Sequence, residues 1–359
     1  MNICIYRGSN QIGGSCVEIE QDGQRIILDV GLPLDAETND KALLPAIEGL
    51  DGSDPDLLGI FLSHTHLDHT GLLKHISPEI KVGLGPAARR IIKAALPFLP
   101  DKFPTVPEGW EYQSWKSFQV GPFKITPYLV DHSAYDAYAL LIEAGNKRLF
   151  YSGDFRGHGR KAKLFQNILT KPPINIDVLL MEGSTLGRID QGLSFPSETD
   201  IENELVNAFT STKGLAMVHA SGQNVDRVVS IMRASKRTNR ILLIDLYTAV
   251  ILEATQNSSI PQSHWPEMAL LVPHYQRVKI LKNAWFDTLK RHSSNRVFLE
   301  KVKQNPEKYT LLFRPLFISD LNRGECLKDS SYIYSQWDGY WERGDYEYVK
   351  DWLDTHGIS

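Results

Sequence analysis

The sequence predicts an α/β protein built from two regions. In the first half, short apolar runs end in polar loops, which is the pattern of strands that carry a site at their ends. In the second half, apolar runs of strand length alternate with helical segments, which favours a parallel sheet between two helical layers. The length of 359 residues exceeds one typical domain, so we expect two domains or one domain with a large insertion.

Composition narrows the class of protein. The chain is 42% hydrophobic and 23% charged, as expected for a globular protein with a sizeable core. The net charge of -4 excludes a globally basic surface, so a nucleic-acid site would have to be a local patch. Three widely spaced cysteines, Cys4, Cys16 and Cys326, predict free thiols in a reducing compartment, the cytoplasm. The sequence has no signal-peptide pattern and no run of about 18 apolar residues, so we expect no membrane association.

The first half reads as strands in hairpin pairs. Residues 2–7 alternate, and residues 16–21 and 25–29 form a hairpin around Asp22-Gly23. For the glycine-rich turn 8–14, a plain turn is favoured over a phosphate-binding loop. The other elements expected here are a buried strand at 57–62, a helix at 86–96, two strands within 118–129, a hairpin of 138–143 with 147–152, and a buried strand at 177–181.

The second half reads as β-α-β-α. The expected helices are 197–212, 221–236 and 247–256, and the expected strands are 214–220, 240–246, 309–319 and 332–336. The basic helical stretch 274–292 fits a solvated face better than a nucleic-acid channel. The aromatic residues between Trp337 and Trp352 fit a core or an interface better than a base-stacking surface.

Candidate metal ligands gather where the strands end. The stretch His64-Thr65-His66-Leu67-Asp68-His69 follows the apolar run 57–62 and holds three of the 11 histidines of the chain. Neutral imidazoles with a neighbouring carboxylate are typical zinc ligands. His132 and Asp154 also leave strand ends, and a metal site needs such convergence from separate elements. Asp29 ends another strand, where it is expected to cap a loop and to orient a metal ligand.

This order of residues resembles the metallo-β-lactamase superfamily. Within it, residues 151–156 (Tyr-Ser-Gly-Asp-Phe-Arg) and Glu182-Gly183-Ser184-Thr185 resemble motifs of the β-CASP nucleases, with the RNase J group as the nearest bacterial relatives. His132-Ser133 with Asp136 resembles a third motif of that family. The resemblance implies an αββα sandwich with an inserted β-CASP α/β subdomain. The implied boundaries are a metallo-β-lactamase core at 1–195, the insertion at 196–335, and a return to the core beginning at 336–359.

The resemblance also implies a chemistry. His64, His66 and His132 would hold one Zn²⁺, Asp68 and His69 a second, and Asp154 would bridge them, with Mn²⁺ as an alternative metal. Asp68 and Glu182 would be catalytic, and the reaction would be hydrolysis of an RNA phosphodiester. The start of the helix at 221–236 supplies candidate RNA contacts, with ordinary capping at least as favoured; these are Ser221, Asn224 and Arg227.

Other functions stay open at this point. One alternative is a β-CASP nuclease that processes DNA, and another is a catalytically impaired nucleic-acid-binding or scaffold subunit. A thioester or lactam hydrolase is less favoured, because it leaves the long insertion unexplained. Two further histidine motifs of the family, motifs B and C, are missing before Ser359. We therefore expect an incomplete second metal site, and a homo-oligomer or a partner chain that completes the C-terminal end.

Overall fold

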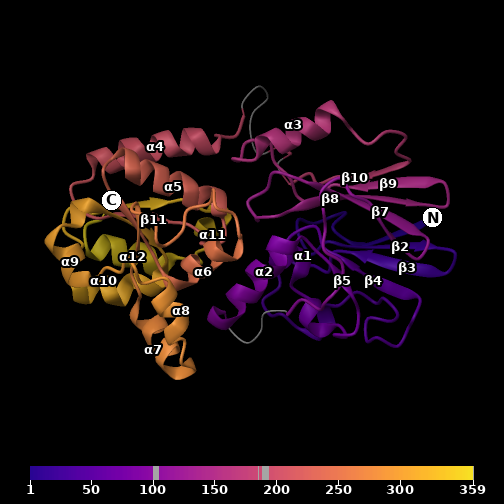
Figure 1. Ribbon diagram of the computed structural model, residues 1–359, viewed down its shortest axis with the longest axis horizontal. Helices are drawn as coiled ribbons and strands as arrows, with labels where there is room; N and C mark the ends of the chain where they lie inside the picture. Colours follow the sequence, from indigo (N-terminus) through magenta and orange to yellow (C-terminus); the bar gives the residue numbers. More distant parts are fainter. Residues whose placement is uncertain (100–104, 185, 188–193, 359) are drawn as a thin grey trace. The chain divides into compact units, whose positions relative to one another are not determined.

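The computed structural model describes residues 1–99, 105–184, 186–187 and 194–358. The chain divides into two compact units, Met1–Phe195 and Pro196–Ser359, and each unit has its own sheets and helices (Figure 1). Among the described residues, no helix is both long enough and apolar enough to cross a membrane.

The first unit contains two five-stranded sheets. One has the order β1-β2-β3-β4-β5, and its strands are β1 Asn2–Arg7, β2 Cys16–Gln21, β3 Gln24–Leu28, β4 Leu57–Phe61 and β5 Val82–Gly83. The other has the order β10-β9-β8-β7-β6, and its strands are β6 Phe118–Val120, β7 Phe123–Leu129, β8 Tyr138–Ala144, β9 Lys147–Tyr151 and β10 Val178–Leu180. Both sheets are mixed: β3, β4 and β5 run parallel in the first, and β10 runs parallel to β9 in the second.

The two sheets pack face to face because their side chains alternate. In β3, Ile26 and Leu28 point into the core between the sheets, whereas Ile27 points to the outer layer. In β8, Leu140 packs in the same central core, whereas Leu141 belongs to the outer layer on the other side. This period of two is what a strand buried on both faces requires.

Helices cover the outer faces of the sandwich. They are α1 Leu67–Thr70, α2 Pro86–Ala95 and α3 Ala162–Thr170. Helix α2 begins with a proline at its first turn, and the Asp136 carboxylate accepts hydrogen bonds from the backbone N–H groups of Ala87 and Ala88 at 2.8 and 3.1 Å, which satisfies two of the donors that a helix start leaves free. Ala88 packs on the outer face of the first sheet, and Ile168 of α3 packs on that of the second. The αββα layering expected for the first unit is therefore confirmed.

The second unit is a parallel sheet between helical layers. Its strand order is β13-β12-β14-β11-β15, with β11 Ala216–His219, β12 Ile241–Ile244, β13 Met268–Leu270, β14 Tyr309–Phe313 and β15 Ser331–Tyr334. Every pairing in it is parallel. The helices are α4 Glu198–Ser211, α5 Val225–Arg237, α6 Leu246–Ala254, α7 His274–Asn283, α8 Phe286–Arg291, α9 Leu299–Gln304, α10 Ile318–Gly324, α11 Asp338–Glu342 and α12 Glu347–Thr355.

Three features differ from the expectations. The strand expected at 309–319 ends at Phe313, because Pro315 starts a 3-10 turn that leads into α10. The strand expected to be buried at 177–181 is the edge strand β10, where Leu179 and Met181 are 56% and 62% exposed. The basic stretch 274–292 forms two helices, separated at Ala284, whose φ of +53° is left-handed.

The C-terminal segment lies in the second unit. We expected residues 336–359 to begin a return to the first unit, but Val349, Trp352 and Leu353 of α12 pack in the core cluster that contains Met217 of β11. Trp352 is 7% exposed, whereas Trp337 is 43% exposed. The aromatic segment is thus mainly a packing layer, as the composition favoured.

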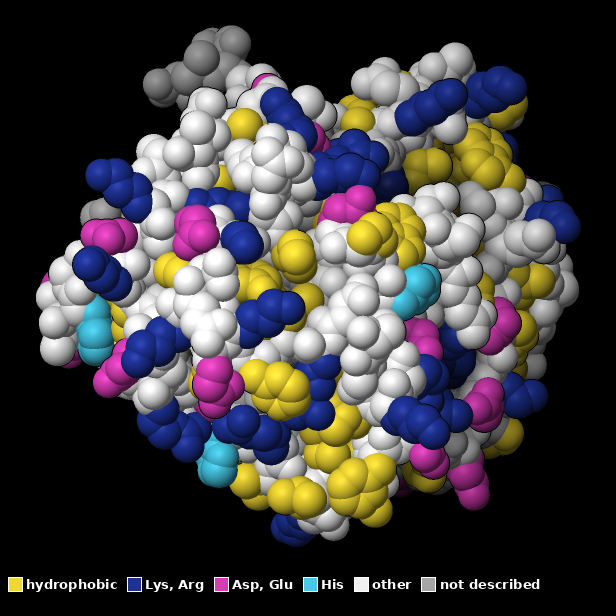
Figure 2. All heavy atoms as spheres, turned by 60° about the vertical axis from the view of Figure 1, so that its left-hand side comes forward, with side chains coloured by type: hydrophobic (Ala, Val, Ile, Leu, Met, Phe, Trp, Pro, Cys, Tyr) yellow, Lys and Arg dark blue, Asp and Glu magenta, His cyan; other side chains and the backbone are white. Residues whose placement is uncertain are grey.

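Surface charge is mixed. Figure 2 shows Lys and Arg side chains interspersed with Asp and Glu on the face that it draws, in keeping with the net charge of -4. This face is not uniformly basic.

Candidate metal centre

The loop that follows β4 is held by the loop that follows β3. The backbone N–H groups of Val30 and Leu32 donate to the carbonyl oxygens of His69 and Leu67, both at 2.9 Å. Gly31 lies between them, and a Cβ at this position would come within 1.8 Å of the Asp68 carbonyl oxygen. Only glycine permits this close approach, which fixes where the histidine-rich stretch lies.

Four imidazoles converge from two loops. The ring centroids of His64 lie 4.8 Å from His66, 4.1 Å from His69 and 4.4 Å from His132. The candidate ligand atoms form two groups, each with all its atoms within 4.8 Å of one another: His64, His66 and His132, and His64, Asp68 and His69. Residues separated by more than 60 positions in the sequence thus share one site.

Asp154 lies between the two groups. Its Oδ1 is 3.3 Å from His69 Nε2, and its Oδ2 is 3.9 Å from His132 Nε2. Gly153 delivers it from the end of β9 with a φ of +53°, and a Cβ on Gly153 would lie 2.6 Å from the Ser63 Cβ. The position of Asp154 suits a carboxylate that serves both groups.

Asp29 connects several residues of the site by hydrogen bonds. It is fully buried, and its carboxylate accepts four hydrogen bonds: from Ser63 N at 2.7 Å, Ser63 Oγ at 2.8 Å, His69 Nδ1 at 2.7 Å and Tyr151 OH at 2.6 Å. A buried carboxylate with this many donors is fixed in orientation. Asp29 therefore contacts the candidate ligand His69 directly.

Two further residues of the site, Ser63 and Tyr151, could not be recognised from the sequence. Both contact Asp29, and Ser63 Oγ also lies 3.0 Å from His64 Nδ1. The signal for Tyr151 was its place at the end of a buried strand, since a buried phenol needs a hydrogen-bond partner. The signal for Ser63 was its hydroxyl next to the first histidine.

The histidines are electrostatically distinct. Burial lowers the pKa of His64 well below its ordinary value, and the neighbouring His69 adds to the effect. Burial, followed by His66, does the same to the pKa of His132. For His69, burial alone would lower the pKa, but the carboxylates of Asp29 and Asp154 raise it well above the ordinary value.

Asp154 is held in its charged form. Burial alone would raise its pKa, but the imidazoles of His69, His132 and His66 outweigh burial and lower the pKa to about 2. The lowered pKa values of His64 and His132 favour neutral imidazoles beside this charged carboxylate, and these are the protonation states in which such side chains bind metal.

The residues present fit a divalent metal ion. His64 Nε2 is buried and has no hydrogen-bond partner among the residues that the structure describes, and an unpartnered buried nitrogen is costly unless something binds it. The surrounding donors are imidazole nitrogens and carboxylate oxygens, the set that divalent ions such as zinc accept.

Glu182 lies beside Asp154 without joining the imidazoles. Its Oε1 accepts a hydrogen bond from Phe155 N at 3.0 Å, and its Oε2 accepts from Ser184 N at 3.2 Å. Glu182 and Asp154 both line a cavity of about 290 Å³. The carboxylate thus orders the segment after Asp154 and faces the space next to the site.

The three candidate RNA contacts all have partners within the second unit. Ser221 Oγ accepts from Gln223 N at 3.2 Å, and the Asn224 side chain caps α5 by accepting from Arg227 N at 3.2 Å. Arg227 is paired with the buried Glu198, with Nε 3.1 Å from Oε2. These contacts are those of a capped, anchored helix start.

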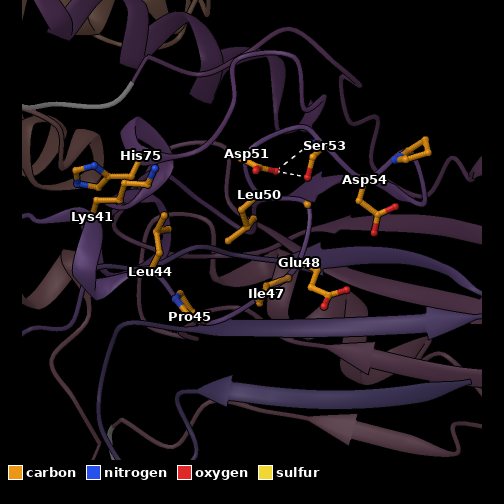
Figure 3. A pocket seen from close by; sticks show the side chains of 12 residues that line it. Lys41, Leu44, Pro45, Ile47, Glu48, Leu50, Asp51, Ser53, Asp54 and His75 are labelled. Carbon is orange, nitrogen blue, oxygen red and sulfur yellow. Dashed lines mark hydrogen bonds between the residues drawn. The ribbon is translucent and has the colours of Figure 1, made fainter.

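A second hollow lies elsewhere on the first unit. It has a volume of about 610 Å³ and is lined by residues of the segment 41–55 and by His75 (Figure 3). Within it the Asp51 carboxylate accepts hydrogen bonds from Ser53 N and Oγ at 3.0 and 2.5 Å. None of the candidate metal ligands is among its lining residues.

Comparison with known proteins agrees with this geometry. The family model described as "Metallo-beta-lactamase superfamily" matches residues 10–172, a span that contains Asp29 and all six candidate ligands. The N-terminal unit belongs to the metallo-beta-lactamase superfamily. The family name and the donor set together imply that this metallo-beta-lactamase unit binds divalent metal.

Curated relatives extend the likeness into the second unit. The chain is 24% identical over 247 residues to Ribonuclease J of Mycoplasma genitalium, which covers 66% of this chain and 42% of the relative. It is 25% identical over 250 residues to Ribonuclease J of Mycobacterium tuberculosis, covering 67% and 43%. A probable RNase of Methanocaldococcus jannaschii is 28% identical over 208 residues, covering 51% and 45%. The chain thus spans less than half the length of these relatives.

A solved structure shares the fold over almost the whole chain. It is a protein of unknown function from Enterococcus faecalis V583, with a TM-score of 0.76, 18% identity, and coverage of 99% of this chain and 86% of that chain. The folds of both units therefore also occur in that protein.

Proposed function

We propose that these residues serve a two-zinc centre, whose second site is completed by a homo-oligomer or a partner chain, and that this centre hydrolyses RNA phosphodiester bonds. The observation that carries the proposal is the buried, unpartnered Nε2 of His64 at the point where the two ligand groups meet. The names of the relatives, Ribonuclease J and a probable RNase, support RNA over DNA as the substrate.

Each side chain has a proposed role. His64, His66 and His132 would hold one zinc ion, and Asp68 and His69 the other, while Asp154 would contribute to both. Divalent ions in such a centre supply Lewis acidity, which activates water and offsets negative charge on the phosphate. Manganese is the expected substitute, because it accepts the same nitrogen and oxygen donors.

The Glu182 carboxylate would act on the substrate rather than on a metal ion. Glu182 faces the cavity that Asp154 also lines, so it is the proposed proton-transfer or positioning group there. Asp68 is proposed as both a ligand and an orienting group, because it stands in the second ligand group.

The second unit is proposed to be the β-CASP insertion. Its parallel sheet between helical layers is the architecture that the motif resemblance implied for residues 196–335. Ser221, Asn224 and Arg227 stay proposed RNA contacts at the start of α5, where helix geometry favours phosphate. To bind RNA, Arg227 would have to share or exchange its pairing with Glu198.

Metal content tests the first half of the proposal. Protein purified without chelator should contain zinc by elemental analysis, and a His64→Ala,His132→Ala variant should lose it. A metal-free protein that also takes up no added zinc or manganese would refute the centre. Replacement of His75, which lies in the hollow of Figure 3 and bonds Asn39 instead, by Ala is the matched control and should leave metal content unchanged.

Cleavage assays test the second half. Labelled single-stranded RNA and DNA of the same sequence should be incubated with the zinc-loaded chain, with Asp68→Ala, and with Asp56→Ala as a carboxylate control. Metal-dependent cleavage of RNA is expected of the unmutated chain and of Asp56→Ala, weak while the second metal site is incomplete, and no cleavage is expected of Asp68→Ala. Preference for DNA would favour a DNA-processing nuclease, and RNA binding without cleavage would favour a scaffold subunit.

A protein partner and a cytoplasmic site of action are also proposed. The free edge of β10, with Leu179 and Met181 exposed, supports strand pairing between two copies of the chain. Sedimentation should then depend on concentration, and Leu179→Lys should abolish that dependence; a monomer at every concentration would contradict the pairing. The three cysteines are free, as a reducing cytoplasm favours.

A further inference from the structure

We propose that Ser63 is a positioning residue which, together with Asp29, sets the ring tautomers of His64 and His69. A single buried carboxylate would thereby orient one imidazole directly and a second one through a hydroxyl group. The inference rests on the metal half of the proposed function and is independent of the substrate.

The first step concerns His69. Its Nδ1 lies 2.7 Å from Asp29 Oδ2, and Asp29 is fully buried. A carboxylate can only accept hydrogen bonds, so the proton must reside on Nδ1. The other nitrogen, Nε2, lies 3.3 Å from Asp154 Oδ1, so it donates to that carboxylate in the metal-free chain and offers its lone pair only when a metal ion displaces its proton.

The second step concerns Ser63. Its Oγ lies 2.8 Å from Asp29 Oδ2 and 3.0 Å from His64 Nδ1. A hydroxyl has one proton, and the carboxylate takes it because it cannot donate. The Ser63 oxygen is therefore an acceptor toward His64, which must carry its proton on Nδ1.

The third step adds a separate observation on His64. If His64 is protonated on Nδ1, its Nε2 is a bare lone pair. In the structure this same atom is buried without a hydrogen-bond partner. The nitrogen that Asp29 and Ser63 leave unprotonated is thus the one without a partner in the described part of the chain, and His64 belongs to both ligand groups. We call the arrangement of Asp29, Ser63 and His64 the relay.

The residues around Ser63 hold its side chain in one orientation. Ser63 is 1% exposed, and its backbone N–H also donates to Asp29, at 2.7 Å. Its carbonyl oxygen accepts from Tyr138 N at 2.8 Å, and Gly153 packs against its Cβ. Ser63 is therefore clamped from both sheets, which suits a group that must hold a ring in one orientation.

The decisive measurement needs no variant. Long-range ¹H–¹⁵N correlation spectra of the ¹⁵N-histidine-labelled full chain, free of metal and then loaded with zinc, report which ring nitrogen carries the proton. We expect Nδ1–H at His64 in both states, and Nδ1–H with a zinc-bound Nε2 at His69 in the loaded state. An Nε2–H tautomer at His64 would overturn the relay.

Variants then separate positioning from packing. Ser63→Ala should let His64 populate the Nε2–H tautomer in the metal-free chain and should weaken zinc affinity, measured by chelator competition, by about 10- to 100-fold, with His69 unchanged. Tyr151→Phe is the matched control, because it removes a hydrogen bond to the same Asp29 oxygen without touching a ring. It should leave both tautomers as they are.

Two results would contradict the inference. One is an unchanged His64 tautomer and zinc affinity in Ser63→Ala; the other is an equal loss in Tyr151→Phe, which would make the effect one of general packing. Failure of the proposed function looks different: a chain with the expected tautomers and zinc affinity that cleaves no RNA refutes the substrate alone.

Discussion

Gly31 shows how one residue can position a whole metal site. Its backbone runs so close to the histidine-rich loop that a Cβ would lie 1.8 Å from the Asp68 carbonyl oxygen. Gly31→Ala should therefore push the two loops apart, with a loss of about 3 kcal/mol in unfolding free energy and loss of zinc binding.

Urea denaturation and chelator competition would measure the Gly31 effect. Gly23→Asn is the control: it lies in the β2–β3 turn with a φ of +81° and open space around it, and asparagine tolerates that conformation. It should change stability by less than about 1 kcal/mol. Equal effects at both glycines would contradict the role of the loop contact.

At the scale of single residues, the sequence indicated the candidate ligands but not the side chains that hold them in place. A cluster of metal-binding side chains within six positions of the sequence is easy to recognise, and this cluster contains His64, His66, Asp68 and His69. Ser63 and Tyr151 could not be assigned, because what matters is their contact with Asp29, and the three residues are far apart in the chain. Contacts of this kind exist only once the two sheets have packed.

Arg240 shows how a single buried cation can join several elements. It is 5% exposed, and its guanidinium donates to the carbonyl oxygens of Phe209, Thr212, Gly214 and Tyr309. It thus connects the end of α4 to the starts of β11, β12 and β14.

Replacing this cation should destabilise the second unit. Arg240→Met leaves buried carbonyl groups without donors, so we expect a loss of about 3 kcal/mol in unfolding free energy, measured by thermal or chemical unfolding. Arg233→Met, at an exposed position of α5, is the control and should be nearly neutral. If Arg240→Met and Arg233→Met had the same unfolding free energy, the hydrogen bonds of Arg240 would contribute no net stability.

His219 predicts how stability depends on pH. It is 2% exposed at the end of β11, with Nδ1 2.6 Å from Tyr332 OH, and burial, assisted by Arg314, lowers its pKa to about 4. In the unfolded chain its pKa is about 6.5. The unfolded state therefore binds the proton more readily than the folded state. The contribution of His219 to the free energy of unfolding is complete above about pH 6.5, and about 3 kcal/mol of it is lost as the pH falls toward 4.

The His219 contribution can be isolated by comparing slopes. Unfolding free energies of the native chain and of His219→Gln should converge as the pH is lowered through this range. Parallel curves would show that His219 is not neutral and buried in solution.

Elements were predictable where local pattern decides them. Alternating apolar residues and glycine turns located the hairpins of the first unit, and β-α alternation located the parallel sheet of the second. Two features were not local. The exposure of β10 depends on which strands pair with it, and β14 ends early because Pro315 can begin a helical turn as well as interrupt a strand.

The whole chain is expected to behave as two units with one metal centre. All six candidate ligands and the supporting Asp29 lie within Met1–Phe195. Residues 1–195 expressed alone should therefore bind zinc with the same stoichiometry as the full chain, and residues 196–359 should unfold cooperatively without zinc. If the isolated first unit bound less metal than the full chain, a ligand from the second unit would be required.

The strand order of the second unit has a consequence for biosynthesis. β11 and β12 are not neighbours, because β14 lies between them and pairs with both. Residues 309–313 must therefore leave the ribosome before the middle of this sheet can close, although its flanking strands were made much earlier. Until then, the edges of 216–219 and 241–244 stay unpaired and prone to association. Ribosome-bound chains halted before residue 309 should bind chaperones through this region, and chains halted far enough beyond residue 334 for β15 to have emerged should not.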